Sequence, residues 1–467
     1  MMKYRGSEIE VPDDDIYKND ALQRRPVVEF ISSFLLDLDG PFVLAIDAPW
    51  GTGKTTLIRM LQAKLKNEGA TNIYFNAWKV DYVTDPLVAL VAAIDKVAPK
   101  DANTMDKFRG HMNTVKKLTT SVAKHGVIAA AKAATLGMLD LEDPLESIAS
   151  DFTGDVTKNI VDSFQKENES LEKLRQELSE AISECSTEKQ GKPIYFFIDE
   201  LDRCRPSFAI ETLERIKHLF DTRNLVFILS IDKRQLQSSV ASIYGEGIDS
   251  QEYLRRFFDM EFSLPPAPQK QFIRAQMNSL EINTYLEGRK NSQQTRDDDD
   301  QLVSALAELA TTFNISLRTL ERVISRIALV CHQTPNTQFL DPILAAFLVI
   351  LRTHNIDVFN DLASGHIEPR GAMEYVQNQR GGKSFRESRL GLIIEAYLIK
   401  GDSDQERRTR TIEGLKNATN TTSHTGTHAR DLLSMLEHTP PHAFHRFDFN
   451  ISTLISKVDL THSLTAN

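Results

Sequence analysis

The stretch Ala48-Pro49-Trp50-Gly51-Thr52-Gly53-Lys54-Thr55-Thr56 lies between an apolar run at residues 42–46 and an amphipathic run at residues 57–61. This order predicts a strand, a glycine-containing loop and a helix, which is the arrangement of a phosphate-binding P-loop. The glycines let the loop turn its N–H groups towards an anion at the helix N-terminus. Lys54 can then reach the β- and γ-phosphates, and the Thr55 hydroxyl can bind Mg²⁺. Although Ala48 stands where the usual pattern has glycine, we predict that residues 48–56 bind a nucleotide.

A second apolar run, residues 194–198, ends in two carboxylates, Asp199 and Glu200. Five consecutive apolar residues indicate a strand that is buried on both faces of a parallel sheet. At the end of such a strand, Asp199 would hold Mg²⁺ and Glu200 would orient and activate the attacking water, as a Walker B pair does. The alternative is that both carboxylates only cap the following helix. With a P-loop upstream, the pair predicts that the nucleotide is hydrolysed.

A third buried run, residues 225–231, predicts another strand that ends in polar side chains. In P-loop ATPases with an inserted strand beside the Walker B strand, a polar residue here senses the γ-phosphate. Ser230 and Asp232 are the candidates. The alternative is that they cap the next helix.

The composition is that of an ordinary water-soluble protein, with 467 residues, 41% hydrophobic and 26% charged. The formal net charge of −10 argues against a chain-wide nucleic-acid surface and leaves only a local basic patch for such a role. Three widely spaced cysteines, Cys185, Cys204 and Cys331, show no metal-binding spacing. The first 20 residues lack the apolar segment of a signal peptide. We therefore expect a cytoplasmic location.

Residues 101–190 show no strand pattern, and we expect a helical insert there. Residues 121–139 are the most continuously apolar stretch of the chain, but Lys124, His125 and Lys132 interrupt it. It is too polar to predict a transmembrane segment. A soluble helix is favoured over a helix on a membrane surface.

Together these motifs make the chain resemble the KAP family of P-loop NTPases. The resemblance covers about residues 20–266 and is carried by residues 50–55, 75–79, 197–204 and 253–265. It implies an α/β fold with an ASCE-type P-loop core, in which another strand of the parallel sheet separates the Walker A and Walker B strands. It also implies ATP and Mg²⁺ as cofactors, although no residue here specifies ATP over GTP. Many members carry transmembrane helices in the insert, from which this charged, alanine-rich insert departs.

The resemblance sets the expected domain organisation. We expect a tail at 1–19, the NTPase domain at 20–266 with the insert at 101–190, a helical lid at 267–363 and a C-terminal region of unknown role at 364–467.

Asp202 and Arg203 match the family pattern after Walker B. Arg255 and Arg256 lie where related ATPases place an arginine that acts on a neighbouring subunit. The alternative for this pair is a solvent-facing charge on a helix.

Residues 313–326 predict a helix capped by Asn314 or Ser316, which is similar to the lid helix of related ATPases. Arg318, and after it Arg322, are the candidates to reach back to the nucleotide, with surface charge as the alternative. Leu340–Leu351 predicts a strongly apolar helix that closes the lid.

Two stretches near the C-terminus read as loops. The acidic run Asp297–Asp300 predicts an exposed loop, and the polar composition of residues 401–428 predicts another. Five histidines lie at positions 424, 428, 438, 442 and 445. Because a loop would not align them and no cysteine or carboxylate pair completes the set, we expect no metal site there.

The expected function is Mg²⁺-dependent ATP hydrolysis that drives a partner complex, formed by further copies of the chain or by proteins of the same operon. Bacterial members of the family are associated with anti-phage defence, which the resemblance extends to this chain. Two alternatives stay open: a slow nucleotide-controlled switch or scaffold, and a membrane-surface organiser that acts through residues 121–139. A nuclease or second hydrolase in the C-terminal part is not expected, because no suitable Asp/Glu/Lys cluster occurs there.

Overall fold

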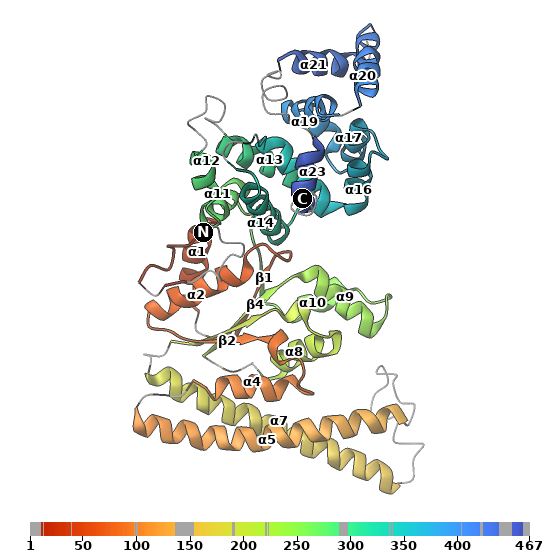
Figure 1. The fold of residues 1–467 in the computed structure, drawn as a ribbon. Helices are drawn as coiled ribbons and strands as arrows, with labels where there is room; N and C mark the ends of the chain where they lie inside the picture. Colours follow the sequence, from red (N-terminus) through yellow and green to blue (C-terminus); the bar gives the residue numbers. More distant parts are fainter. Residues whose placement is uncertain are drawn as a thin grey trace. The chain divides into compact units, whose positions relative to one another are not determined.

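The computed structural model describes residues 11–460, apart from 136–153, 189–191, 289–297, 421–423 and 439–450 and a few isolated positions (13, 39, 98, 100, 220, 221, 223, 336, 337, 339 and 403). Two compact units make up the chain (Figure 1). The sheet unit contains Glu10–Asp20 and Arg24–Pro266. The helical unit contains Ala21–Gln23 and Ala267–Asn467. Each unit is described by itself.

In the described part of the chain, the sheet unit holds one sheet of five parallel strands in the order β2-β3-β4-β1-β5. The strands are β1 (Phe42–Asp47), β2 (Thr71–Asn76), β3 (Ile194–Asp199), β4 (Leu225–Ile231) and β5 (Met260–Ser263). The predicted inserted strand is confirmed, because β4 lies between the Walker A strand β1 and the Walker B strand β3. The α/β fold with an ASCE-type order is therefore confirmed.

Alternation of side chains along β3 explains why both faces of the sheet are covered. Tyr195 and Phe197 pack into one core with α1 and α2, whereas Phe196 and Ile198 pack into a second core on the other face. All six residues of β3 are buried, as the apolar run predicts. Figure 1 shows α1 and α2 on one side of the sheet and α4, α5 and α7 on the other. The helices of this unit are α1 (Arg25–Leu36), α2 (Lys54–Asn67), α3 (Ala77–Val80), α4 (Pro86–Ile94), α5 (Ala102–Thr135), α7 (Gly154–Glu188), the 3₁₀ turn η1 (Leu201–Arg203), α8 (Pro206–Leu219), α9 (Lys233–Tyr244) and α10 (Ser250–Arg255).

The predicted insert forms the long helices α5 and α7, which lie along each other beneath α4 (Figure 1). Phe108 and Met112 of α5 and Leu174 and Leu178 of α7 are buried in the same core as α4. The backbone of residues 121–135 belongs to α5, and the rest of the 121–139 stretch lies outside the described residues. Of the residues described, no helix is long and apolar enough to span a bilayer.

The helical unit consists of α11 (Gln269–Ser279), α12 (Ile282–Gly288), α13 (Asp298–Thr312), α14 (Leu317–His332), α15 (Pro342–His354), α16 (Ile356–Ser364), α17 (Pro369–Gln377), α18 (Gly382–Glu387), α19 (Arg389–Lys400), α20 (Gln405–Ala418), α21 (His424–His438) and α23 (Ile451–Asp459). Ser316 caps α14 by accepting a hydrogen bond from the Thr319 amide at 3.2 Å, so of the two predicted caps Ser316 is the one used. The predicted apolar helix is α15, capped by Asp341. The predicted boundary between the lid and the C-terminal region falls at residue 363, near the end of α16. Helices on both sides of it, from α11 to α23, share one core. The boundary stays a prediction.

The two loop predictions in this unit are wrong for the segments that form helices, and Asp297 lies outside the described residues. Asp298–Asp300 form the first turn of α13, and Asp298 is buried. Carboxylates are favourable there because the N-terminus of a helix carries partial positive charge. Residues 405–418 and 424–438 form α20 and α21, whose buried Leu415, Leu432 and Leu436 pack against α19. Tertiary packing of this apolar stripe outweighs the polar composition of the segment.

A buried carboxylate, Glu395 of α19, ties three elements of the helical unit together. It accepts hydrogen bonds from Arg386 Nη2 at 2.8 Å and from Arg370 Nε at 3.4 Å, and it contacts His428 Nε2 at 3.0 Å. The predicted loop histidine His428 thus lies on a helix and serves this network. Burial raises the pKa of Glu395, but the hydrogen bonds and charges of His428 and Arg386 outweigh burial and bring the pKa to about 2.

We expect Glu395→Gln to lower the free energy of unfolding by about 2–4 kcal/mol, because it leaves the partly buried guanidinium of Arg386 without its counter-charge. Since the folded pKa lies below the unfolded value, the stabilisation is present above about pH 4.5 and is lost as the pH falls towards 2. Urea unfolding between pH 7 and pH 2.5 measures both effects. Glu413→Gln, an exposed carboxylate on α20, is the matched control. Equal unfolding midpoints for the two variants at pH 7 would contradict the role of the network.

Candidate nucleotide-binding site

The predicted P-loop joins the carboxyl end of β1 to the N-terminus of α2. Gly51 and Gly53 adopt positive φ angles of 79° and 85°, a conformation that glycine tolerates at no steric cost. Gly53 is the N-cap of α2 and has no side chain to occupy the free N–H groups of the first turn. The Ala48 amide donates to the Ile231 carbonyl at 3.1 Å, which fixes the start of the loop to β4. The loop therefore presents a helix N-terminus suited to an anion.

Lys54 opens α2 and is buried at the base of this loop. Its Nζ donates to the carbonyls of Ala48 and Pro49, the latter at 3.4 Å. Burial lowers the pKa of Lys54, and the carboxylates of Asp202, Asp232, Asp199 and Asp47 oppose that shift. The ammonium thus lies in an acidic pocket that favours its charged form against the cost of burial.

The Walker A and Walker B residues meet directly. The Thr55 hydroxyl donates to Asp199 Oδ2 at 2.9 Å, and the Tyr74 hydroxyl donates to the same oxygen at 3.1 Å. Asp199 is only 1% exposed. A hydroxyl and a carboxylate are hard oxygen ligands, and Mg²⁺ in nucleotide sites takes one or two such ligands together with phosphate oxygens and water. The residues present therefore fit Mg²⁺.

Glu200 directly follows β3 and is held from two sides. Asn76 Nδ2, at the end of the neighbouring strand β2, donates to Oε2 at 2.9 Å. Arg203 Nη1 pairs with Oε1 at 2.8 Å. The backbone of Glu200 has a φ of 61°, a left-handed conformation that non-glycine residues adopt at a cost and that is often found at active sites. The Cys204 thiol donates to the Glu200 carbonyl at 3.6 Å and stabilises the turn. The capping alternative for this residue is not seen, because no side-chain cap bond is made to η1.

Two further aspartates shape the loop around Trp50. The indole N–H of Trp50 donates to Asp202 Oδ2, and the Trp50 amide donates to Asp232 Oδ2 at 3.2 Å. Burial raises the pKa of Asp202, while Lys54 and Trp50 act to lower it. Asp232 also caps α9 through the Arg234 amide, so the capping alternative holds for Asp232. Ser230 lies on β4 level with Asp199, and its buried hydroxyl has no hydrogen-bond partner among the described residues; its role as a γ-phosphate sensor stays a prediction.

Arg24 is a buried residue of the site that sequence reasoning missed. Its Nη2 donates to the carbonyl of Thr52 in the P-loop at 3.3 Å, and its Nη1 donates to the Pro265 carbonyl at 2.7 Å. Burial lowers its pKa. No local pattern marks this arginine, because both of its partners are backbone atoms distant in the sequence. Asn76 was likewise missed as a partner of Glu200, although its position at the end of a strand is the signal that could have found it.

The four candidate arginines are solvent-exposed in the single chain. Arg255 pairs with Glu252 on the same helix at 3.1 Å, and Arg256 follows at the end of α10. Arg318 and Arg322 are exposed on α14 of the helical unit. A role at the nucleotide stays a prediction for all four.

Similarity to known proteins is clearest at the level of the family. The KAP family P-loop domain matches residues 24–332. The Phage T7 exclusion protein of Escherichia coli (strain K12) is 22% identical over 240 residues, which cover 50% of this chain and 31% of that relative. The match thus spans about a third of the relative's length. A solved structure of the Aeropyrum pernix ORC2 protein (ADPNP-ADP complexes) is similar at a TM-score of 0.28 with 13% identity, and the match covers 89% of this chain and 94% of that one.

The family match covers well over half of the chain and includes the P-loop, the Walker B pair and both strands that position them. The chain belongs to the KAP family of P-loop NTPases.

Proposed function

We propose that the chain is a Mg²⁺-dependent ATP hydrolase that couples ATP binding and hydrolysis to a partner complex. The observation that supports this most is the 2.9 Å contact between Thr55 and Asp199, with Glu200 next in the chain. It supports the proposal that Thr55 and Asp199 bind the metal ion and that Glu200 is the general base, at the edge of the sheet beside the P-loop. The choice of ATP over GTP rests on the family alone.

Each group has a distinct role in the proposed reaction. Lys54 and the N–H groups of the loop would bind the phosphates of the nucleotide. Thr55 and Asp199 would hold Mg²⁺, which when bound neutralises charge on the phosphate oxygens. Glu200 would orient the water so that it attacks in line with the bond that breaks. It would also accept the proton that this water loses. An arginine from a neighbour or from the lid would stabilise the charge of the transition state.

The contacts of Glu200 favour slow, partner-controlled turnover. Both of its carboxylate oxygens are engaged, one by Asn76 and the other by Arg203. These contacts stabilise the charged carboxylate and so reduce its basicity, and it accepts a proton from water more readily once they loosen. This supports the nucleotide-controlled switch as the second candidate function.

The biological setting is proposed from the relative. Because the matched protein is named for phage exclusion, we propose a role in anti-phage defence in the cytoplasm. The partner complex would contain further copies of the chain or proteins encoded in the same operon.

Glu200→Gln is expected to lower ATP turnover by about 100-fold or more while ATP binding is retained, because only the base is removed. Lys54→Ala is expected to lose ATP binding itself. Steady-state hydrolysis with Mg²⁺ and equilibrium binding of a labelled ATP analogue separate the two effects. The control is Glu246→Gln, an exposed carboxylate in the loop after α9. Full turnover by Glu200→Gln would exclude the assigned base.

Asn76→Ser is expected to raise basal turnover by about 3- to 10-fold, because it frees one oxygen of Glu200. Serine keeps an oxygen that can cap α3, which Asn76 caps through the Lys79 amide. Single-turnover hydrolysis with bound ATP measures the chemical step directly. Turnover that stays unchanged or falls would count against gating by Asn76.

Mixing two inactive variants tests the predicted arginines. Glu200→Gln keeps its arginines but lacks the base, whereas the double variant Arg255→Ala, Arg256→Ala keeps the base. If an arginine acts across subunits, the mixture regains turnover that neither variant has alone. A mixture of Glu200→Gln and Lys54→Ala should stay inactive and is the control. Absence of recovery in the first mixture, with the oligomer shown to form, would exclude Arg255 and Arg256.

A further inference from the structure

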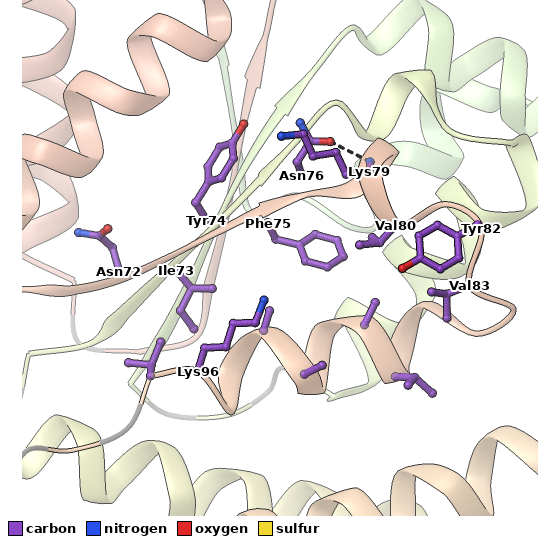
Figure 2. Close-up of a pocket in the computed structure, with 15 residues that line it drawn as sticks. Asn72, Ile73, Tyr74, Phe75, Asn76, Lys79, Val80, Tyr82, Val83 and Lys96 are labelled. Carbon is purple, nitrogen blue, oxygen red and sulfur yellow. Dashed lines mark hydrogen bonds between the residues drawn. The ribbon is translucent and has the colours of Figure 1, made fainter. Parts of the chain in front are cut away.

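A groove of about 580 Å³ lies between the strand β2 and the helix α4 (Figure 2), and no residue of the neighbouring strand β3 is among the described residues that line it. One wall is the continuous strand segment 72–76. The other wall is a single stripe of α4 and the turn after it, made by Val88, Ala89, Ala92, Ala93, Lys96 and Val97. Tyr82 and Val83 close one end, as Figure 2 shows. A groove with one strand wall and one helix wall has the form of sites that bind extended peptides.

The strand wall is an open sheet edge. β2 is the outermost strand of the sheet and pairs only with β3 among the described residues. The backbone N–H and C=O groups that point away from β3 can therefore pair with a further strand. Because the segment 72–76 spans five consecutive residues, a short extended peptide could form a ladder along its length.

The helix wall is apolar on its outward face. The sequence of α4, Pro86–Ile94, contains no polar side chain. Its inner side packs into the core, while the outward Val88 is 42% exposed and Tyr82 at the end of the groove is 83% exposed. A helix that is apolar on all sides is normally covered on all sides. The small Ala89, Ala92 and Ala93 leave the space that side chains of a bound peptide would fill.

The charges in the groove are positive. Lys79 and Lys96 line it, and no carboxylate is among its described lining residues. The nearest acidic neighbours in sequence are engaged elsewhere, since Asp81 pairs with Arg205 at 3.0 Å and Asp95 pairs with Lys116 at 2.7 Å. Edge-to-edge pairing of two copies would bring these lysines towards each other. An acidic occupant instead complements them.

We propose that this groove binds an extended, acidic peptide segment of a partner protein by strand addition to β2. The peptide backbone pairs with the free edge of residues 72–76. Every second side chain of the peptide is apolar and lies on the alanine stripe of α4. Carboxylates of the peptide meet Lys79 and Lys96. The binding itself does not depend on nucleotide hydrolysis.

The test is selection of a displayed random heptapeptide library on the full chain, followed by fluorescence anisotropy with the enriched peptides. We expect peptides with alternating apolar residues and at least one carboxylate. Ala92→Arg fills the groove and is expected to weaken their binding at least tenfold. The double variant Lys79→Glu, Lys96→Glu is expected to weaken it by a similar factor and to select basic peptides instead. Matched controls are Ala363→Arg on α16 and Lys270→Glu on α11, both at exposed positions.

Thermal unfolding must show that Ala92→Arg folds as the parent chain does. If it does not, Val88→Lys at the same wall replaces it.

Three results would overturn the proposal. The library could yield no enriched peptide, or the enriched peptides could bind the groove variants as tightly as the parent chain. Alternatively, sedimentation could show that Ala92→Arg dissociates a dimer of the parent chain, which would make the groove a contact between copies. Absence of ATP turnover in the parent chain would count against the proposed function but not against peptide binding in this groove.

Discussion

The site depends on the alignment of three parallel strands whose carboxyl ends meet at one edge of the sheet. The Walker A and Walker B strands are not neighbours, because β4 lies between them. Ser230 of β4 is level with Ile46 on one side and with Asp199 on the other. This register brings Thr55, in the first turn of the helix after β1, within hydrogen-bond distance of Asp199. A shift of β4 by one residue would exchange the faces of its side chains and separate the two motifs.

The same alignment concentrates negative charge around one cation. Asp47, Asp199, Asp202 and Asp232 all act on the buried Lys54. A triphosphate would add further negative charge at this edge, which Mg²⁺ and the lysine together would offset in the proposed function. The indole contact of Trp50 with Asp202 and its amide contact with Asp232 hold two of these carboxylates to the loop. In the proposed function, the acidic character of the pocket would couple nucleotide binding to Mg²⁺ binding.

The local motifs could be predicted from sequence, but their partners could not. The P-loop, the Walker B pair and the strands before them are local patterns, and the structure contains them where the sequence predicts. Asn76 lies 124 residues before Glu200, and Arg24 lies 241 residues before Pro265, so only the folded chain brings these pairs together. The helices α20 and α21 were missed for a related reason. Their polar composition conceals an apolar stripe that gains its stability by packing on α19.

The thiol of Cys204 makes the turn that carries Glu200 accessible to a chemical measurement. Burial and the nearby carboxylates of Asp81, Asp202 and Glu200 raise its pKa to about 12, so the folded chain holds it as an unreactive neutral thiol. A thiol reagent can reach it only when the turn that carries Glu200 opens. Its rate of modification, compared with those of the buried Cys185 and Cys331, therefore measures the free energy of local unfolding at the Walker B turn.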